Sequence, residues 1–68
     1  MKASRAFVTR TPAEGGLRVR LDAATRDSSA KRLASWNAPG STPAPGAPPI
    51  EVAVVEYGNG ILVLGEVI

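Results

Sequence analysis

The sequence IEVAVVEYGNGILVLGEVI, residues 50–68, decides the fold. Two runs rich in valine, isoleucine and leucine, 50–57 and 61–68, lie on either side of Gly58-Asn59-Gly60. Asparagine and glycine accept the positive φ that tight hairpin turns require. The stretch therefore predicts an antiparallel hairpin of two strands.

The faces of this hairpin are unusually apolar. In the first run Ile50, Val52 and Val54 share one face, and the adjacent Val54-Val55 predicts either a bulge or a strand buried on both sides. The second run is apolar on both faces as far as Glu66. A chain of 68 residues is too short to cover both faces, and an uncovered apolar face usually marks a contact surface. We therefore expect a protein interface on the last strand, at Leu62, Leu64 and Ile68.

A second hairpin is predicted in the N-terminal part of the chain. Residues 3–10 read as a strand, which Pro12 ends because proline lacks a backbone donor. Gly15-Gly16 supplies the positive φ for a reversal. Residues 17–22, LRVRLD, alternate strictly between apolar and polar side chains, as a half-buried antiparallel strand does.

The middle of the chain is less regular. Residues 23–29 are small and polar, so we expect a loop. Residues 30–36 suit a short strand or a single helical turn, and we favour the strand because the other segments imply a sheet that needs closing. The only phenylalanine, Phe7, is expected in the core. The only tryptophan, Trp36, is either a packing anchor or an interface hot spot.

Residues 37–49, NAPGSTPAPGAPP, contain five of the six prolines. Such a segment tolerates neither strand nor helix and should be extended and exposed, in part as polyproline II. A loop of this length in a small domain is usually functional or disordered. It is either an arm that contacts a neighbouring subunit, through Pro43, Pro45 and Pro48, or a mobile connection.

The composition excludes several kinds of site. The absence of cysteine and histidine leaves no disulfide, no thiolate metal site and no histidine base. No phosphate-binding glycine loop is present, and Ser and Thr have no evident base. We therefore expect no enzyme, no catalytic residue, no bound metal and no cofactor. No signal peptide or membrane span is apparent, so we expect synthesis in the cytoplasm.

The charge is unevenly distributed. All eight basic residues lie in the first 32 positions, although the net charge is only +2. Arginines on wet strand faces keep a β protein soluble and discourage edge pairing. Alternatively, the basic half faces an anionic partner, with Arg18 and Arg20 as nucleic-acid contacts.

Five short strands with glycine turns predict an all-β fold. We expect one domain, residues 1–68, forming a five-stranded antiparallel barrel that is OB-like or SH3-like, with the long Pro-rich loop outside it.

The arrangement of motifs resembles small OB-like barrel proteins from the structural-gene clusters of tailed bacteriophages. The resemblance rests on Gly16-Leu17-Arg18-Val19-Arg20-Leu21-Asp22 and on the closing Gly60-Ile61-Leu62-Val63-Leu64-Gly65. The chain departs from that pattern at Gly46-Ala47-Pro48-Pro49, where those proteins have a Gly-Asp entry to the fourth strand. The resemblance implies a non-enzymatic structural protein of the virion, a tail or capsid accessory component made in the host cytoplasm. Its partners would be other subunits of the particle. A small basic nucleic-acid-binding barrel is the alternative.

Overall fold

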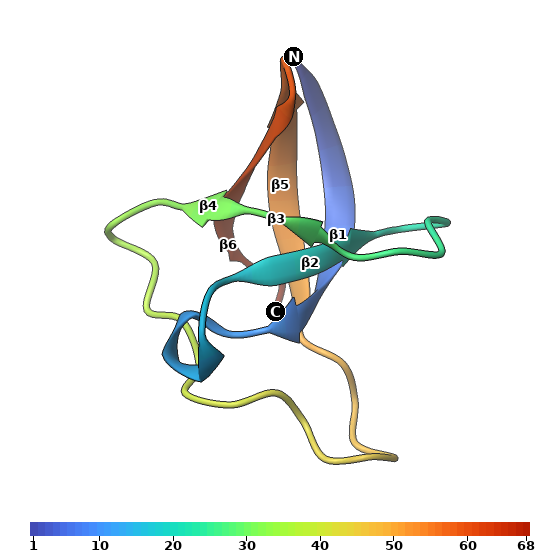
Figure 1. Cartoon of the computed structure of the whole chain (residues 1–68), viewed down its shortest axis with the longest axis vertical. Coiled ribbons are helices and arrows are strands. Elements are labelled where there is room, and N and C mark those ends of the chain that lie inside the picture. The colour runs from blue at the N-terminus through green and yellow to red at the C-terminus, as the bar shows by residue number, and fades with distance from the viewer.

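The computed structural model describes all of residues 1–68 and is all-β, as predicted. Its single sheet has 6 strands, with one short 3-10 helix, η1 (Pro12–Glu14), between the first two. The strands are β1 (Lys2–Arg10), β2 (Arg18–Leu21), β3 (Ser28–Ser29), β4 (Lys31–Arg32), β5 (Glu51–Tyr57) and β6 (Gly60–Glu66), as shown in Figure 1.

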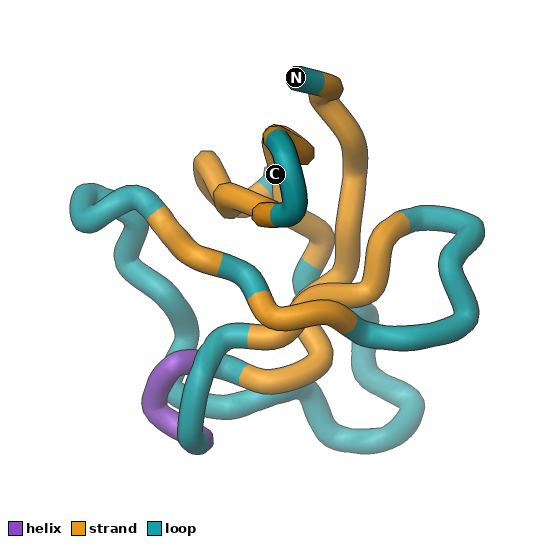
Figure 2. The backbone as a smooth tube through the Cα atoms, turned by 45° about the horizontal axis from the view of Figure 1, so that its top comes forward, coloured by secondary structure: helices purple, strands orange, loops and turns teal.

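The sheet curls into a nearly closed barrel. The strand order is β3-β2-β1-β5-β6-β4. The two outermost strands, β3 and β4, lie on either side of Ala30 in one extended segment, so the chain itself joins the two ends of the sheet (Figure 2). β3 pairs antiparallel with β2, whereas β4 pairs in parallel with β6.

This order corresponds to an OB-like barrel rather than an SH3-like one. If β3 and β4 count as one bent strand, residues 28–32, the barrel has five strands, of which β5 is the fourth and β6 the fifth. The first strand then lies between the second and the fourth, and the third closes the barrel by pairing in parallel with the fifth. That is the five-stranded Greek-key arrangement. The prediction of a purely antiparallel barrel of five strands is thus corrected in two details: the closing pair is parallel, and the third strand is split.

The split explains why the sequence placed the third strand wrongly. It begins at Ser28, within the predicted loop 23–29, and its second part ends at Arg32. Residues 33–36 form a turn in which the Trp36 amide donates to the Leu33 carbonyl at 3.1 Å. Each of the two alternatives for 30–36, strand and turn, therefore describes a part of it.

The core is built from small apolar side chains on the inner row of each strand. Residues of this inner row are cross-strand partners of one another, since Ala6 of β1 is opposite both Leu21 of β2 and Val52 of β5. The buried apolar residues are Ala6, Val8, Leu17, Val19, Val52, Val54 and Val63. Leu21, Ala30, Trp36, Ile50 and Ile61 pack against them and are partly buried. The period-2 patterns of residues 17–22 and 50–54 predicted this inner row correctly.

Phe7 does not belong to this core, and its predicted burial is wrong. Its neighbours Ala6 and Val8 are buried, whereas Phe7 is only half-buried and lies outside the core cluster. Successive side chains of a strand point to opposite faces, so Phe7 points outward.

The hairpin of β5 and β6 forms as predicted, with two differences in detail. Its turn has two residues, Gly58 and Asn59, and only Gly58 has a positive φ, of 49°. A positive φ at the first turn position alone is typical of a type II′ turn. The predicted bulge is present, but the extra residue is Leu64 of β6, because Val54 pairs with Val63 and Ala53 with Gly65.

Hydrogen bonds hold the first part of the Pro-rich loop against the segment after β1. Thr11, the only buried polar residue, has its hydroxyl 3.0 Å from Glu14 Oε1 and 3.3 Å from the Gly40 carbonyl oxygen. The Thr42 hydroxyl donates to the other oxygen of Glu14 at 3.4 Å. Farther along, residues 44–47 form a turn, and the loop extends below the barrel in Figure 1.

Candidate functional site

Four exposed apolar side chains lie along the end of β6 and just after β4: Leu64 in β6, Val67 and Ile68 after it, and Leu33 after β4. The Leu33 amide donates to the Val63 carbonyl at 3.1 Å and so continues the β4–β6 pairing by one residue. Because Arg32 is opposite Val63, Leu33 lies next to Leu64. Leu33 is 39% exposed, Leu64 41% and Val67 47%, and Ile68 is fully exposed. We call these four residues the β6 rim.

The backbone of β6 is open on the same side. On its outer edge β4 pairs only with Leu62 and Val63. On its inner edge β5 accompanies it to Glu66, and the Val67 amide then donates to the Glu51 carbonyl at 2.8 Å. Beyond Val63 the strand therefore has a partner on one side only. An apolar strand with a free edge is a template for pairing with another chain.

The rim includes two of the predicted interface residues and excludes the others. Leu64 and Ile68 belong to it, and Leu62 lies next to it, half-buried. Trp36 is half-buried against the core, as expected if it is a packing anchor rather than an interface hot spot. Its carbonyl accepts a hydrogen bond from Arg32 at 3.0 Å.

The proline candidates lie elsewhere, in the loop below the barrel. Pro43 is half-buried, and Pro45 and Pro48 are exposed. Pro45 and Gly46, whose φ is 88°, are the central residues of the turn at 44–47. Proline followed by glycine with positive φ is the pattern of a type II turn.

The sequence did not indicate Leu33 as part of an interface, because its place beside Leu64 depends on the parallel closure.

The predicted nucleic-acid face lies on the outside of β1 and β2, and acidic residues partly neutralise it. The Arg18 Nε donates to Asp27 Oδ2 at 2.6 Å. This hydrogen bond is the main reason that the pKa of Asp27 is lowered. Arg5 likewise donates to Asp22 at 2.7 Å and lies 3.8 Å from Glu51. The hydrogen bond from Arg5 lowers the pKa of Asp22.

Arg20 is also engaged within the chain. Its guanidinium lies over the Phe7 ring, and it donates to the Ala24 carbonyl at 3.1 Å. Of the two predicted nucleic-acid contacts, Arg18 is therefore ion-paired and Arg20 is stacked. The sequence did not predict these partners, because it does not show how the loop at residues 22–27 folds back along β2.

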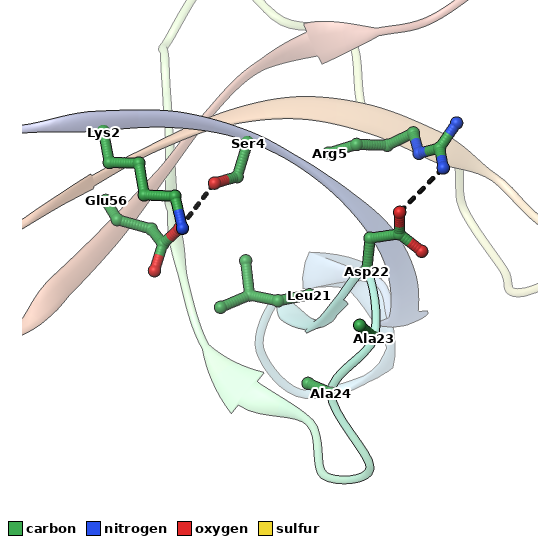
Figure 3. Close-up of a pocket in the computed structure, with 8 residues that line it drawn as sticks. All are labelled: Lys2, Ser4, Arg5, Leu21, Asp22, Ala23, Ala24 and Glu56. Carbon is green, nitrogen blue, oxygen red and sulfur yellow. Dashed lines mark hydrogen bonds and ion pairs between the residues drawn. The ribbon is translucent and has the colours of Figure 1, made fainter.

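The largest cavity, of about 450 Å³, lies beside the start of β1 and was not predicted (Figure 3). Lys2, Ser4 and Glu56 line one side, with the Ser4 hydroxyl donating to Glu56 at 2.5 Å. Leu21 and the chain after it line the other. The cavity exists because β2 pairs with β1 only from Ala6 onward and the Asp22 amide donates to the Arg5 carbonyl, so that residues 2–4 of β1 pair only with β5.

The fold and these surfaces define a small OB-like barrel with an apolar rim. No group of three acidic side chains is arranged to hold a metal ion. The structure contains no helix with the length and hydropathy of a membrane span. Comparisons with protein-family models, with curated proteins and with solved structures find no match.

Proposed function

We propose that this chain is a non-enzymatic structural component of a bacteriophage particle, a tail or capsid accessory protein that acts through protein–protein contacts. The observation that carries the proposal is the β6 rim, where exposed leucine, valine and isoleucine side chains border an unpaired strand edge. Its partners would be other subunits of the particle, and its location the virion.

Two physical arguments support a contact role for the rim. Large contiguous apolar patches on soluble proteins usually mark interaction sites. Large apolar side chains next to a free strand edge also give a partner both main-chain hydrogen bonds and side-chain burial. The motif resemblance of residues 16–22 and 60–65 supports the assignment to phage structural proteins in particular.

The first test is whether the chain is found in particles. Phage or prophage particles produced by cells that carry the gene should contain the chain in a fixed ratio to the major structural proteins, as measured by quantitative mass spectrometry. Leu64→Lys should reduce its incorporation at least tenfold, because it places a charge on the rim. A chain absent from purified particles would contradict the proposal.

A matched control separates the rim from general instability. Leu62→Lys is unsuitable because Leu62 is half-buried, whereas Thr25→Lys changes an exposed residue of the loop between β2 and β3, outside the β6 rim. Thr25→Lys should be incorporated like the wild type. Circular dichroism should show that both variants are folded.

A second candidate function is nucleic-acid binding. It is favoured by the OB-like strand order, since OB folds bind oligonucleotides on the face of the second and third strands. Arg18 and Arg20 lie on that face. Their ion pair and stacking favour the first proposal, and salt-dependent binding distinguishes the two.

A further inference from the structure

We propose that a second copy of this chain occupies the β6 rim, and that copies join head to tail. The open edge of β6 in one copy would pair with the open edge at the start of β1 in the next. This inference rests on the proposed function, because it names the partner of the same rim. It adds a second surface, the start of β1, to which the sequence assigned no role.

The two edges are the opposite sides of one three-stranded unit. β5 lies between β1 and β6 and pairs with both. The far side of β1 is unpaired at residues 2–4, and the far side of β6 is unpaired beyond Val63. The start of β1 is beside the β5–β6 turn at the top of Figure 1, whereas β6 ends lower in the molecule. Each copy therefore offers two different free edges at different ends.

The charges on these edges favour pairing between unlike edges. Lys2 lies on the β1 edge and Glu66 on the β6 edge, both are exposed, and neither belongs to an ion pair within the chain. A second β1 edge, Lys2-Ala3-Ser4, offers no acidic partner to Lys2, and a second β6 edge, Leu64-Gly65-Glu66, offers no basic partner to Glu66, so either pairing of like edges adds only a like charge. Like charges on neighbouring strands are unfavourable. Only the head-to-tail arrangement places Lys2 beside Glu66.

The two charges also lie on the same face of the sheet. Lys2 and Ser4 share the inner row of β1 with Ala6, and Glu66 is opposite the buried Val52. If the sheets of two copies join smoothly, Lys2 and the Glu66 of the next copy project to the same side. Their side chains can then form an ion pair across the joint.

The cavity beside β1 leaves room for an added strand. It occupies about 450 Å³ next to the unpaired residues 2–4, on the line that β2 would follow if it continued past Leu21. A strand placed there would lie about 4.8 Å from β1, within hydrogen-bonding distance. A contact between two different surfaces repeats from copy to copy and yields a ring or a filament.

Charge reversal tests the arrangement. Sedimentation velocity over a range of concentrations at low salt should show wild-type assemblies larger than dimers, which dissociate as salt is added. Lys2→Glu alone and Glu66→Lys alone should each weaken association at least tenfold. The variant with both substitutions should recover it, and so should an equimolar mixture of the two single variants, because each then offers the complementary edge.

The control is Arg26→Glu, which changes the net charge as Lys2→Glu does but lies in an exposed loop. It should associate like the wild type, and urea unfolding should show that all variants are equally folded. A monomeric wild type, or a double variant that fails to recover, would overturn the head-to-tail inference. The proposed function would still stand if the chain is found in particles and Leu64→Lys prevents its incorporation, since the rim would then bind a different subunit.

Discussion

The guanidinium carbon of Arg20 lies 5.3 Å from the centre of the Phe7 ring, on the outer face of β1 and β2. The two residues are direct cross-strand partners. The arginine thus covers one face of a ring that strand alternation places outside the core, between the inward-facing Ala6 and Val8. The stacked arginine partly shields the ring from water.

We expect the pair to stabilise the fold by about 0.5–1 kcal/mol beyond the contribution of each side chain alone, as is typical of exposed cation–π contacts. A double-mutant cycle with Arg20→Ala and Phe7→Leu, followed by urea unfolding, measures this coupling. Arg26→Ala serves as the control, because Arg26 is exposed and contacts no ring. A coupling energy of zero would mean that the stacked pair contributes nothing beyond its two separate side chains.

Thr11 holds the beginning of the Pro-rich loop against η1. Its side chain is fully buried, and its hydroxyl is within hydrogen-bonding distance of both Glu14 and the Gly40 carbonyl. Thr11→Val keeps the shape but removes the hydroxyl, and should lower the free energy of unfolding by about 1–2 kcal/mol. Amide hydrogen exchange should also become faster at residues 40–42. Thr25→Val, at an exposed position, should change neither measurement.

The acid sensitivity of the fold should depend on Asp27. The hydrogen bond from Arg18 lowers the pKa of Asp27 in the folded chain below its value of about 3.9 in the unfolded chain. A lowered folded pKa gives stability that is fully present above about pH 4 and is lost as the pH falls through the folded pKa.

Asp27→Asn should therefore be less stable than the wild type at pH 7, with the difference shrinking below pH 4. Urea unfolding at a series of pH values measures this convergence. Asp22 and Glu14, whose pKa values are also lowered, keep part of the acid sensitivity in the variant. A difference that stays constant down to pH 2 would show that the Arg18–Asp27 ion pair does not stabilise the fold.

The parts of the fold that sequence predicted are those set by local patterns. Alternation in residues 17–22 and the turn at Gly58 determined two hairpins, since neighbouring strands and their turn specify each other. A closing strand was predicted at residues 30–36, but its start at Ser28 and its parallel pairing with β6 were not, because Ser28-Ser29 and Lys31-Arg32 have no strand-like composition. They adopt extended structure only because β2 and β6 each offer them an edge.

The candidate site was predicted in part for the same reason. Apolar residues on both faces of β6 indicated Leu64 and Ile68 directly from the sequence. Leu33 and Lys2 were missed, because their positions depend on where neighbouring strands stop. The sequence predicted a loop from residue 23, but it did not show that the start of β1 would lack a partner on that side, nor that β4 would end at Arg32 beside the middle of β6.

Nucleic-acid binding gives the most direct way to reject the proposed function. Contact with phosphates releases counterions, so that the logarithm of the binding constant falls with the logarithm of salt concentration by about 0.9 per phosphate on duplex DNA. Because Arg18 is already paired with Asp27 at 2.6 Å, we expect no salt-dependent binding of single- or double-stranded DNA by the wild type near physiological ionic strength. Fluorescence anisotropy with labelled oligonucleotides measures this. Binding that weakens steeply with salt, and is lost in Arg18→Glu and Arg20→Glu but kept in Leu64→Lys, would establish the second function in place of the first.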